Sequence, residues 1–268
     1  MSLSQPAQLA QSCSPRPVTA VVVVAMPEEA APFVAALEPL PSAAPLPPLP
    51  GPGGVVSLTL PERPGLGAAN HAGPRELVLV RSGIGLVNAA SALATVLVAV
   101  QPELVISAGT TGGLGRQVEV GDVCVSDTLS YTDADATAFG YARGQVPGMP
   151  VLYVGDSAAL DLLAQRAEVL RGATASSGQA RLHRGLMLAG QAFVTAANVA
   201  DAREVFPAAL STDMESTALA QVAAGAGLPF VSVRGVSDLC GPEAGQDFHI
   251  GVEEAATRSA ALVLSLLA

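Results

Sequence analysis

Short runs of valine, leucine, isoleucine and alanine recur along the whole chain, and most of them end at a glycine, a proline or an acidic residue. Such runs are typical of strands that are buried on both faces of a sheet. Segments with helical periodicity separate most of these runs. The order of elements therefore predicts an α/β protein, with a single three-layer α/β/α domain around a mixed central sheet. With seven or more strands in one domain, such a sheet is expected to curl toward a barrel.

The expected elements follow this alternation. Strands are expected at 18–25, 55–60, 77–81, 104–107, 121–130, 185–193, 210–214 and 230–236. Helices are expected at 27–37, 86–100, 157–170, 198–206, 215–225 and 253–267. The small residues at 108–113 follow a predicted strand and favour a place where a ligand can lie against bare backbone; the alternative is a simple turn. A polar loop is expected at 173–184 and a long irregular segment at 131–150.

Two segments lack the signals of a helix or a strand. Residues 1–17 have neither a basic start nor an apolar core, so they do not resemble a secretory signal. We expect them to be a disordered tail before a domain that spans 18–268. Residues 39–54 are too rich in proline for a helix or a sheet interior, and we expect a semi-rigid surface loop within that domain. No apolar run approaches the roughly 20 residues that a membrane-spanning helix needs, so no membrane partner is expected.

Charge and cysteine content exclude several classes of function. A formal net charge of −10 with 13 Lys and Arg residues disfavours nucleic acid as a partner, because phosphate backbones would be repelled. The three cysteines, Cys13, Cys124 and Cys240, are scattered without the spacing of metal ligands. They predict reduced thiols in a cytoplasmic protein.

The histidines give no sign of a metal site or of a catalytic triad. None of the three, His71, His183 and His249, is spaced from a cysteine or an acid as metal ligands are. A G-x-S-x-G motif is absent from the sequence, which disfavours a serine hydrolase. Neither a metal nor another cofactor is expected.

Three carboxylates, Glu29, Glu215 and Asp238, follow predicted strands. Ligands of open α/β sheets collect at the carboxyl ends of strands, so these acids are candidates for one site. Carboxylates without a metal or a histidine suit acid–base hydrolysis, in which one acid assists the leaving group and another positions water. Glycosyl bonds are the usual target of this division of labour. The alternative is that the acids are helix caps and surface charges.

Two further features near these acids suggest other chemistry, but neither is interpreted as a functional motif of its own. Ser82-Gly83-Ile84-Gly85 precedes a helix, but Asn88 stands where a dinucleotide fingerprint needs its third glycine, so a tight turn that admits a ligand explains it better. Cys240 has no base beside it in the sequence and is interpreted as a bystander rather than a nucleophile.

Eight segments together resemble the 5′-methylthioadenosine/S-adenosylhomocysteine nucleosidases of the purine nucleoside phosphorylase superfamily. They are AMPEE at 25–29, SGIG at 82–85, AGTTGG at 108–113, VGDV at 120–123, DADATAFGYARGQVPG at 133–148, GQAFV at 190–194, DMES at 213–216 and RGVSD at 234–238. The resemblance implies a nucleoside phosphorylase-like fold and hydrolysis of the N-glycosidic bond of a 5′-substituted adenosine. Pro27 and Asp213 depart from the family's usual residues, which leaves the preferred 5′-substituent open.

The resemblance also implies catalytic roles. Asp238 would protonate the purine at N7, and Ser237 would orient it. A protonated carboxyl at this place could donate to N7 and accept from the 6-amino group, which selects 6-aminopurines. Glu29 would position and activate the attacking water, assisted by Ser82 and Arg234.

Substrate binding is implied for a second group of residues. Glu215 would accept both ribose hydroxyls, and Met214 would pack against the sugar. Adenine would be held by Phe193 and Val194. A segment from the other subunit of a homodimer would cover the 5′-substituent with Phe139, Tyr141 and Pro147.

Other functions remain open at this point. A purine nucleoside phosphorylase is disfavoured, because the acids of the 26–29 turn would repel phosphate. A futalosine or aminodeoxyfutalosine hydrolase uses the same scaffold, and a non-catalytic nucleoside binder is a third possibility. The resemblance places a nucleosidase in methionine salvage.

Overall fold

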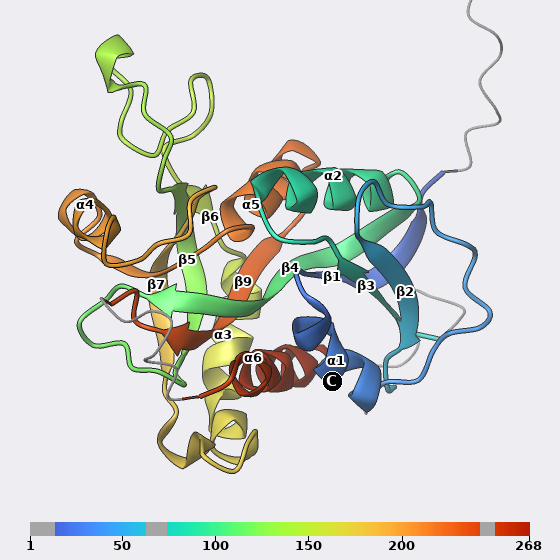
Figure 1. Ribbon diagram of the computed structural model, residues 1–268. Helices are drawn as coiled ribbons and strands as arrows, with labels where there is room; N and C mark the ends of the chain where they lie inside the picture. The colour runs from blue at the N-terminus through green and yellow to red at the C-terminus, as the bar shows by residue number, and fades with distance from the viewer. Residues whose placement is uncertain (1–13, 63–73, 242–249) are drawn as a thin grey trace, which may run out of the picture.

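A nine-stranded mixed sheet forms the centre of the computed structural model, which describes residues 14–62, 74–241 and 250–268 (Figure 1). The strands are β1 (Arg16–Val24), β2 (Gly54–Thr59), β3 (Glu76–Arg81), β4 (Val100–Gly113), β5 (Val123–Tyr131), β6 (Tyr153–Val154), β7 (Leu182–Ala189), β8 (Ala209–Asp213) and β9 (Phe230–Asp238). The helices are α1 (Pro27–Ala36), α2 (Leu86–Leu97), α3 (Ser157–Gln165), α4 (Val199–Val205), α5 (Ser216–Gly225) and α6 (Val252–Leu267). The predicted α/β architecture with a mixed sheet is confirmed.

Five of the strands close into a ring. β9 pairs with β4 in parallel and with β5 antiparallel, β5 pairs with β7, β7 with β8, and β8 with the end of β4. The strands β1, β3 and β2 extend the sheet from β4 on one side. The predicted curl toward a barrel is therefore present, and it brings the carboxyl end of β8 next to those of β4 and β9.

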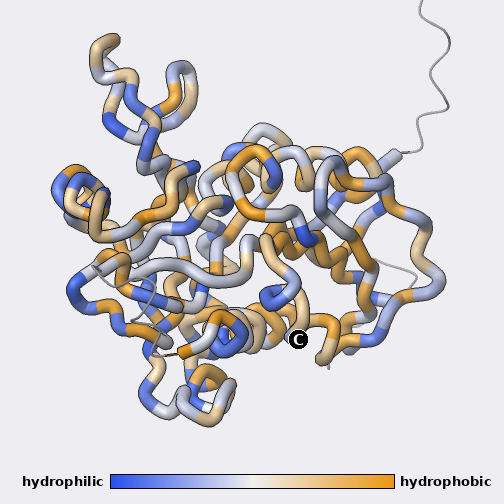
Figure 2. Tube along the Cα trace, in the orientation of Figure 1, coloured by the Kyte–Doolittle hydropathy of each residue, from blue (hydrophilic) through white to orange (hydrophobic). Residues whose placement is uncertain are grey.

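Helices cover both faces of the sheet. α2 and α5 pack together on one face, and α1, α3 and α6 lie on the other (Figure 1). The apolar residues concentrate in the strands and in the helix faces turned toward them (Figure 2). Phe33 of α1 and Leu93 of α2, one in each layer, are fully buried. Each such side chain contributes about 1.5–3 kcal/mol through the apolar surface that it removes from water.

β1 and β4 begin earlier than predicted, at Arg16 and Val100. β1 starts at Arg16, inside the expected tail, because Arg16 stands opposite Val100 of β4 and its side chain binds Glu76 at 2.6 Å. Residues 1–13 lie outside the described part. α2 ends at Leu97, short of its predicted end, because Val100 already belongs to β4.

The strand predicted at 104–107 is too short, since residues 108–113 form the second half of β4, which excludes the alternative of a simple turn. Small residues serve here to let other groups approach the strand. A Cβ on Gly109 would lie 2.3 Å from the carboxylate of Glu29, and one on Gly112 would lie 2.4 Å from the Sγ of Cys240. The register with β9 shifts between Thr111 and Gly112, which bends the strand end.

The predicted loop at 173–184 ends too late, because β7 already begins at Leu182. β7 also ends at Ala189, so residues 190–193 leave the sheet and form the start of a loop. β9 continues to Asp238, two residues beyond its predicted end, and α3 stops at Gln165 before a 3-10 helix at Ala167–Gly172. β6 was not predicted.

Two expected irregular segments are present. Residues 40–53 contain neither helix nor strand, in agreement with the proline-rich loop. The segment between β5 and β6 projects away from the body of the molecule and carries a 3-10 turn at Thr137–Phe139 (Figure 1). No helix of the described residues is long and apolar enough to cross a membrane.

Candidate active site

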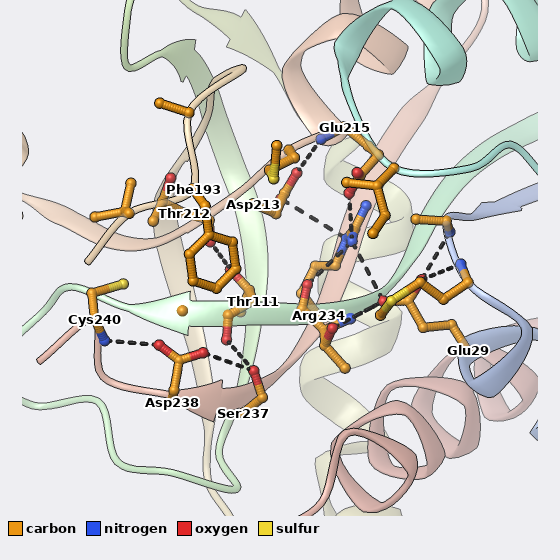
Figure 3. Close-up of a pocket in the computed structure, with 18 residues that line it drawn as sticks. Glu29, Thr111, Phe193, Thr212, Asp213, Glu215, Arg234, Ser237, Asp238 and Cys240 are labelled. Atoms are coloured by element: carbon orange, nitrogen blue, oxygen red, sulfur yellow. Dashed lines mark hydrogen bonds and ion pairs between the residues drawn. The ribbon is translucent and has the colours of Figure 1, made fainter. Parts of the chain in front are cut away.

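A cavity opens at the carboxyl ends of β1, β4, β8 and β9 (Figure 3). Its lining combines small and apolar residues with four carboxylates and one arginine. The residues that line it are Ala25, Met26, Glu29, Ile84, Thr110, Thr111, Gly112, Ala192, Phe193, Val194, Thr212, Asp213, Met214, Glu215, Arg234, Ser237, Asp238 and Cys240. A few convergent polar groups in a concave apolar site are typical of a small-molecule site.

Glu29 is held at one end of the cavity by four hydrogen bonds. Its Oε2 accepts from the amides of Ala25 at 2.8 Å and Met26 at 3.1 Å. Its Oε1 accepts from the amide of Thr110 at 2.7 Å and from the Thr110 hydroxyl at 3.0 Å. Pro27 at the first position of α1 starts the helix directly after β1, which places Glu29 in the first turn beneath these amides.

Gly109 makes this arrangement possible. Its φ of +134° lies in a region that side chains rarely adopt, and the Glu29 carboxylate occupies the space of its missing Cβ. The segment 108–113 therefore contributes to the site through close packing on a carboxylate.

Arg234 lies at the centre of three carboxylates (Figure 3). Its Nη1 donates to Glu215 Oε2 at 3.2 Å, and the same atom is 4.0 Å from Glu29 Oε1. Its Nε is 3.9 Å from Asp213 Oδ2, too far for a hydrogen bond. Arg234 is 1% exposed, so water screens the interactions between this one guanidinium and the three carboxyl groups poorly.

Glu215 has spare acceptor capacity that faces the cavity. Its Oε1 accepts from the amide of Gly85 at 2.9 Å and its Oε2 accepts from Arg234. A carboxylate offers about four lone-pair sites, so two remain for a ligand. Burial raises the pKa of Glu215 to about 7; Arg234 opposes the rise, and the nearby Asp213 adds to it.

The raised pKa predicts a pH-dependent stability. Between its ordinary value of 4.5 and about 7, the folded protein holds the Glu215 proton more tightly than the unfolded chain does. The contribution of this group is therefore full below pH 4.5 and is lost as the pH rises through 7. We expect Glu215→Gln, which cannot titrate, to remove this loss. The measurement is the melting temperature of ligand-free wild type and Glu215→Gln from pH 4.5 to 8. Glu28→Gln, at an exposed position, is the control. Parallel curves for wild type and Glu215→Gln would contradict the prediction.

Asp238 stands at the other end of the cavity. Its Oδ2 accepts from the Ser237 hydroxyl at 3.0 Å, and its Oδ1 accepts from the amide of Cys240 at 2.9 Å. The Ser237 hydroxyl also faces the carbonyl of Thr111 at 3.4 Å. Asp238 is 4% exposed, so these contacts fix the plane of a carboxyl group that faces a shielded space.

Cys240 lines the cavity beside Asp238 but has no features of a nucleophile. Burial raises the pKa of its thiol to about 12, and the neighbouring Asp238 charge adds to this rise. A protonated, buried thiol is a poor nucleophile. The structure therefore agrees with its interpretation as a bystander, although it forms part of the wall.

Most of the site residues predicted from the sequence come together in this cavity. Those that line it are Asp238, Glu29, Arg234, Glu215, Met214, Ser237, Phe193 and Val194. Phe193 lines the cavity although it is 59% exposed (Figure 3).

Four predicted residues do not line the cavity of this chain. Ser82 is buried, and its hydroxyl faces the carbonyls of Gly83 at 2.8 Å and Val24 at 3.2 Å. Phe139, Tyr141 and Pro147 lie on the projecting segment between β5 and β6, and Phe139 is 83% exposed.

Sequence reasoning missed two polar residues of the site. The sequence indicates Thr110 only as one of the small residues beside a ligand, yet its amide and hydroxyl hold Glu29. Asp213 was noted for its position, but the sequence has no signal that its Oδ1 accepts from the amides of Glu215 and Ser216, at 2.8 and 2.7 Å. It thereby caps the start of α5 and fixes where Glu215 points.

The histidines lie elsewhere or outside the described part. His183 was expected in a loop without an acidic partner, but it belongs to β7 and its Nε2 is 2.6 Å from Asp122 Oδ2. This pair is formed because β5 and β7 are neighbours in the sheet. His71 and His249 lie outside the described residues. Within the described part, no group of three or more His, Cys, Asp and Glu side chains is arranged to hold a metal ion.

A mixed sheet with a carboxylate-lined cavity at its strand ends defines a class of α/β proteins, and comparison of this chain with known protein families identifies that class. The model of the phosphorylase superfamily matches residues 19–268, so the chain belongs to this superfamily. A 5′-methylthioadenosine/S-adenosylhomocysteine nucleosidase of Chromohalobacter salexigens is 40% identical over 72% of this chain and 79% of its own. The nucleosidase of Geobacillus kaustophilus is 41% identical over the same shares. Within the superfamily, the chain belongs to the 5′-methylthioadenosine/S-adenosylhomocysteine nucleosidase family.

Solved structures agree with this placement. The nucleosidase of Neisseria meningitidis, in complex with methylthio-immucillin-A, has a TM-score of 0.77 and 31% identity, covering 92% of this chain and 97% of its own. The nucleosidase of Colwellia psychrerythraea, in complex with adenine, has the same TM-score and identity over 93% and 94% of the two chains.

Proposed function

We propose that this protein hydrolyses the N-glycosidic bond of 5′-substituted adenosines, 5′-methylthioadenosine and S-adenosylhomocysteine, to adenine and the 5′-substituted ribose. Its family membership supports the activity, and the cavity supplies groups for each part of such a substrate. An acid stands at one end, a buried carboxylate at the other, and an acceptor for hydroxyls between them (Figure 3).

The base end is assigned to Asp238. As a protonated acid it donates to purine N7, which makes adenine a better leaving group. Ser237 and the Cys240 amide hold the carboxyl in place. Phe193 and Val194 cover the adenine from the loop that follows β7, where Phe193 offers a ring face to the purine.

The sugar end is assigned to Glu215 and Met214. The two free acceptor sites of the Glu215 carboxylate match the two hydroxyl donors of ribose. Bond cleavage builds positive charge on the sugar, and the carboxylates around Arg234 stabilise this charge because they are fixed before the reaction begins.

Glu29 is assigned as the group that positions and activates water. Both of its oxygens are occupied by two donors each, so a water must replace one of them. The three amide donors belong to the rigid backbone, whereas the Thr110 hydroxyl can rotate away. The water would therefore bind Glu29 Oε1 in place of that hydroxyl. Ser82, which faces backbone carbonyls, supports the turn rather than the water in this arrangement.

The observation that carries hydrolysis over phosphorolysis is the occupation of the anion-binding amides by Glu29. The amides of Ala25, Met26 and Thr110 converge on one point at the start of α1, as in a phosphate site. The chain's own carboxylate already fills that point. Arg234 is the only basic side chain among the described lining residues, and carboxylates surround it. A phosphate dianion would be repelled there.

The test is adenine release from 5′-methylthioadenosine, S-adenosylhomocysteine and aminodeoxyfutalosine, measured side by side without phosphate. Release from the first two supports the proposal. Release from aminodeoxyfutalosine alone would assign the protein to that alternative hydrolase activity. Activity that requires phosphate and yields a ribose 1-phosphate would identify a phosphorylase, and tight binding without turnover would identify a nucleoside binder.

We also propose a homodimer in which the projecting segment of one subunit covers the cavity of the other. Phe139 and Pro147 are exposed on this segment and do not line the cavity of their own chain. Aromatic side chains such as Phe139 are enriched at protein interfaces. Sedimentation of the active protein is expected to give a dimer, and a fully active monomer would contradict this arrangement.

The remaining proposals concern the setting of the enzyme. A cytoplasmic location is supported by Cys124 and Cys240, both buried free thiols. The substrates named for the relatives support a place in methionine salvage. Both would be tested by fractionation of the source cells and by loss of growth on 5′-methylthioadenosine when the protein is removed.

A further inference from the structure

Three buried serines link the cavity's arginine to the start of a helix. Ser107 of β4 and Ser232 of β9 stand opposite each other in the parallel register, and Ser216 is the first residue of α5. All three are 0% exposed. Burying a hydroxyl costs free energy unless it is hydrogen-bonded, so the hydrogen bonds of these three serines contribute to the stability of this region.

Hydrogen bonds connect Arg234 to all three serines. Arg234 Nη2 lies 2.6 Å from Ser107 Oγ, and a guanidinium can only donate, so Ser107 accepts. Ser107 Oγ lies 3.0 Å from Ser216 Oγ, which lies 2.9 Å from Ser232 Oγ, and either hydroxyl of each pair can be the donor. Linked hydrogen bonds that include a charged donor polarise and strengthen one another.

These contacts form a closed ring that includes Glu215, the carboxylate assigned to the ribose hydroxyls. Arg234 Nη2 binds Ser107, Ser107 binds Ser216, Ser216 follows Glu215 in the chain, and Glu215 binds Arg234 Nη1. The orientation of the guanidinium therefore depends on the position of the first residue of α5, and the reverse also holds. Without the Ser107 hydroxyl, Nη2 would lose its acceptor, and the guanidinium would be held through Nη1, which donates to Glu215 and to the Thr110 carbonyl at 3.1 Å. Rotation about this end of the guanidinium would move Nη1 relative to Glu215.

We infer that Ser107 and Ser216 are positioning residues for the sugar subsite: they hold Arg234 so that Glu215 keeps two acceptor sites directed at the ribose hydroxyls. Ser107 acts directly on the guanidinium, and Ser216 acts one step further through its hydrogen bond with Ser107. Neither residue lines the cavity.

The kinetic test, which rests on the proposed function, compares 5′-methylthioadenosine with its 2′-deoxy analogue. Ser107→Ala is expected to lower kcat/KM about tenfold for the ribonucleoside, since a hydrogen bond to a charged group is lost. The loss is expected to be only about twofold for the 2′-deoxy substrate, which lacks one of the hydroxyls that Glu215 binds. Ser216→Ala should show the same pattern with a smaller loss, about threefold on the ribonucleoside. Equal losses on both substrates, or no loss, would overturn the inference.

The matched control is Thr217→Val. Thr217 is the next residue of α5 and is equally buried, but its hydroxyl donates to the Ser130 carbonyl at 2.8 Å and does not face Arg234. We expect it to leave the preference between the two substrates unchanged.

A second measurement needs no turnover, so it separates this inference from the proposed function. Hydrogen bonds slow the rotation of guanidinium amino groups, and the Arg234 Nη2 protons should give separate NMR signals in the ligand-free wild type, assigned with Arg234→Lys. Ser107→Ala should merge or lose these signals, and Thr217→Val should keep them. Separate signals that persist in Ser107→Ala would overturn the inference. Failure of wild-type turnover with the expected NMR result would contradict only the proposed function.

Discussion

Asp238→Asn is expected to lower kcat for 5′-methylthioadenosine by ~10²-fold or more, as general-acid catalysis is removed. An asparagine amide can still face N7 but cannot transfer a proton to it. KM should change much less, because the contact with the base is retained. The measurement is adenine release at substrate concentrations above and below KM.

The fold should tolerate this substitution, which keeps the experiment interpretable. The asparagine oxygen can accept from the Cys240 amide as Asp238 Oδ1 does at 2.9 Å. The Ser237 hydroxyl can turn to the Thr111 carbonyl, 3.4 Å away, and leave its own oxygen to accept from the new amide. Asp161→Asn, a surface change in an ion pair with Arg184, is the charge-matched control. Near-normal activity of Asp238→Asn with an unchanged melting temperature would contradict its role as the acid.

The second large effect is expected for Glu29→Gln, which should lose ~10²-fold or more of kcat because it cannot accept a proton from water. This substitution also places a hydrogen-bond donor against backbone amides that are donors themselves. Whichever way the amide is oriented, its NH2 group faces either the amides of Ala25 and Met26 or that of Thr110. Donors left without an acceptor cost about 1–3 kcal/mol, so the melting temperature should fall as well.

Glu28→Gln separates these causes. Glu28 precedes Glu29 in the same helical turn, but it is exposed and does not line the cavity. It should leave both activity and melting temperature close to those of the wild type. Activity of Glu29→Gln is measured well below its own melting temperature, so that unfolding does not contribute. An active Glu29→Gln protein would move the water-activating role to another group.

Local patterns in the sequence determined much of the fold. The valine run before Met26 and the proline and acids after it predict where β1 ends and α1 begins, because burial and helix capping act over a few neighbouring residues. The same signals place Glu29, Glu215 and Asp238 after strands, and the structure brings all three to one cavity. β4 was predicted far too short, because Pro102, Glu103 and the glycines at 109, 112 and 113 have low strand propensity. Pairing with the neighbouring strands β1 and β9 stabilises this strand in spite of its composition.

By itself, the sequence determined the alternation of elements, the acids that follow strands and, through its motifs, the family resemblance. Only the tertiary structure decided how these acids are held. Thr110 reaches Glu29 across 81 positions of the chain, and Ser107 reaches Ser216 across 109. Contacts of this kind depend on which strands become neighbours and on the closing of the ring through β9. Pairing between distant strands leaves no periodic signal in either partner, because each strand is stabilised by whatever surface the rest of the fold presents to it.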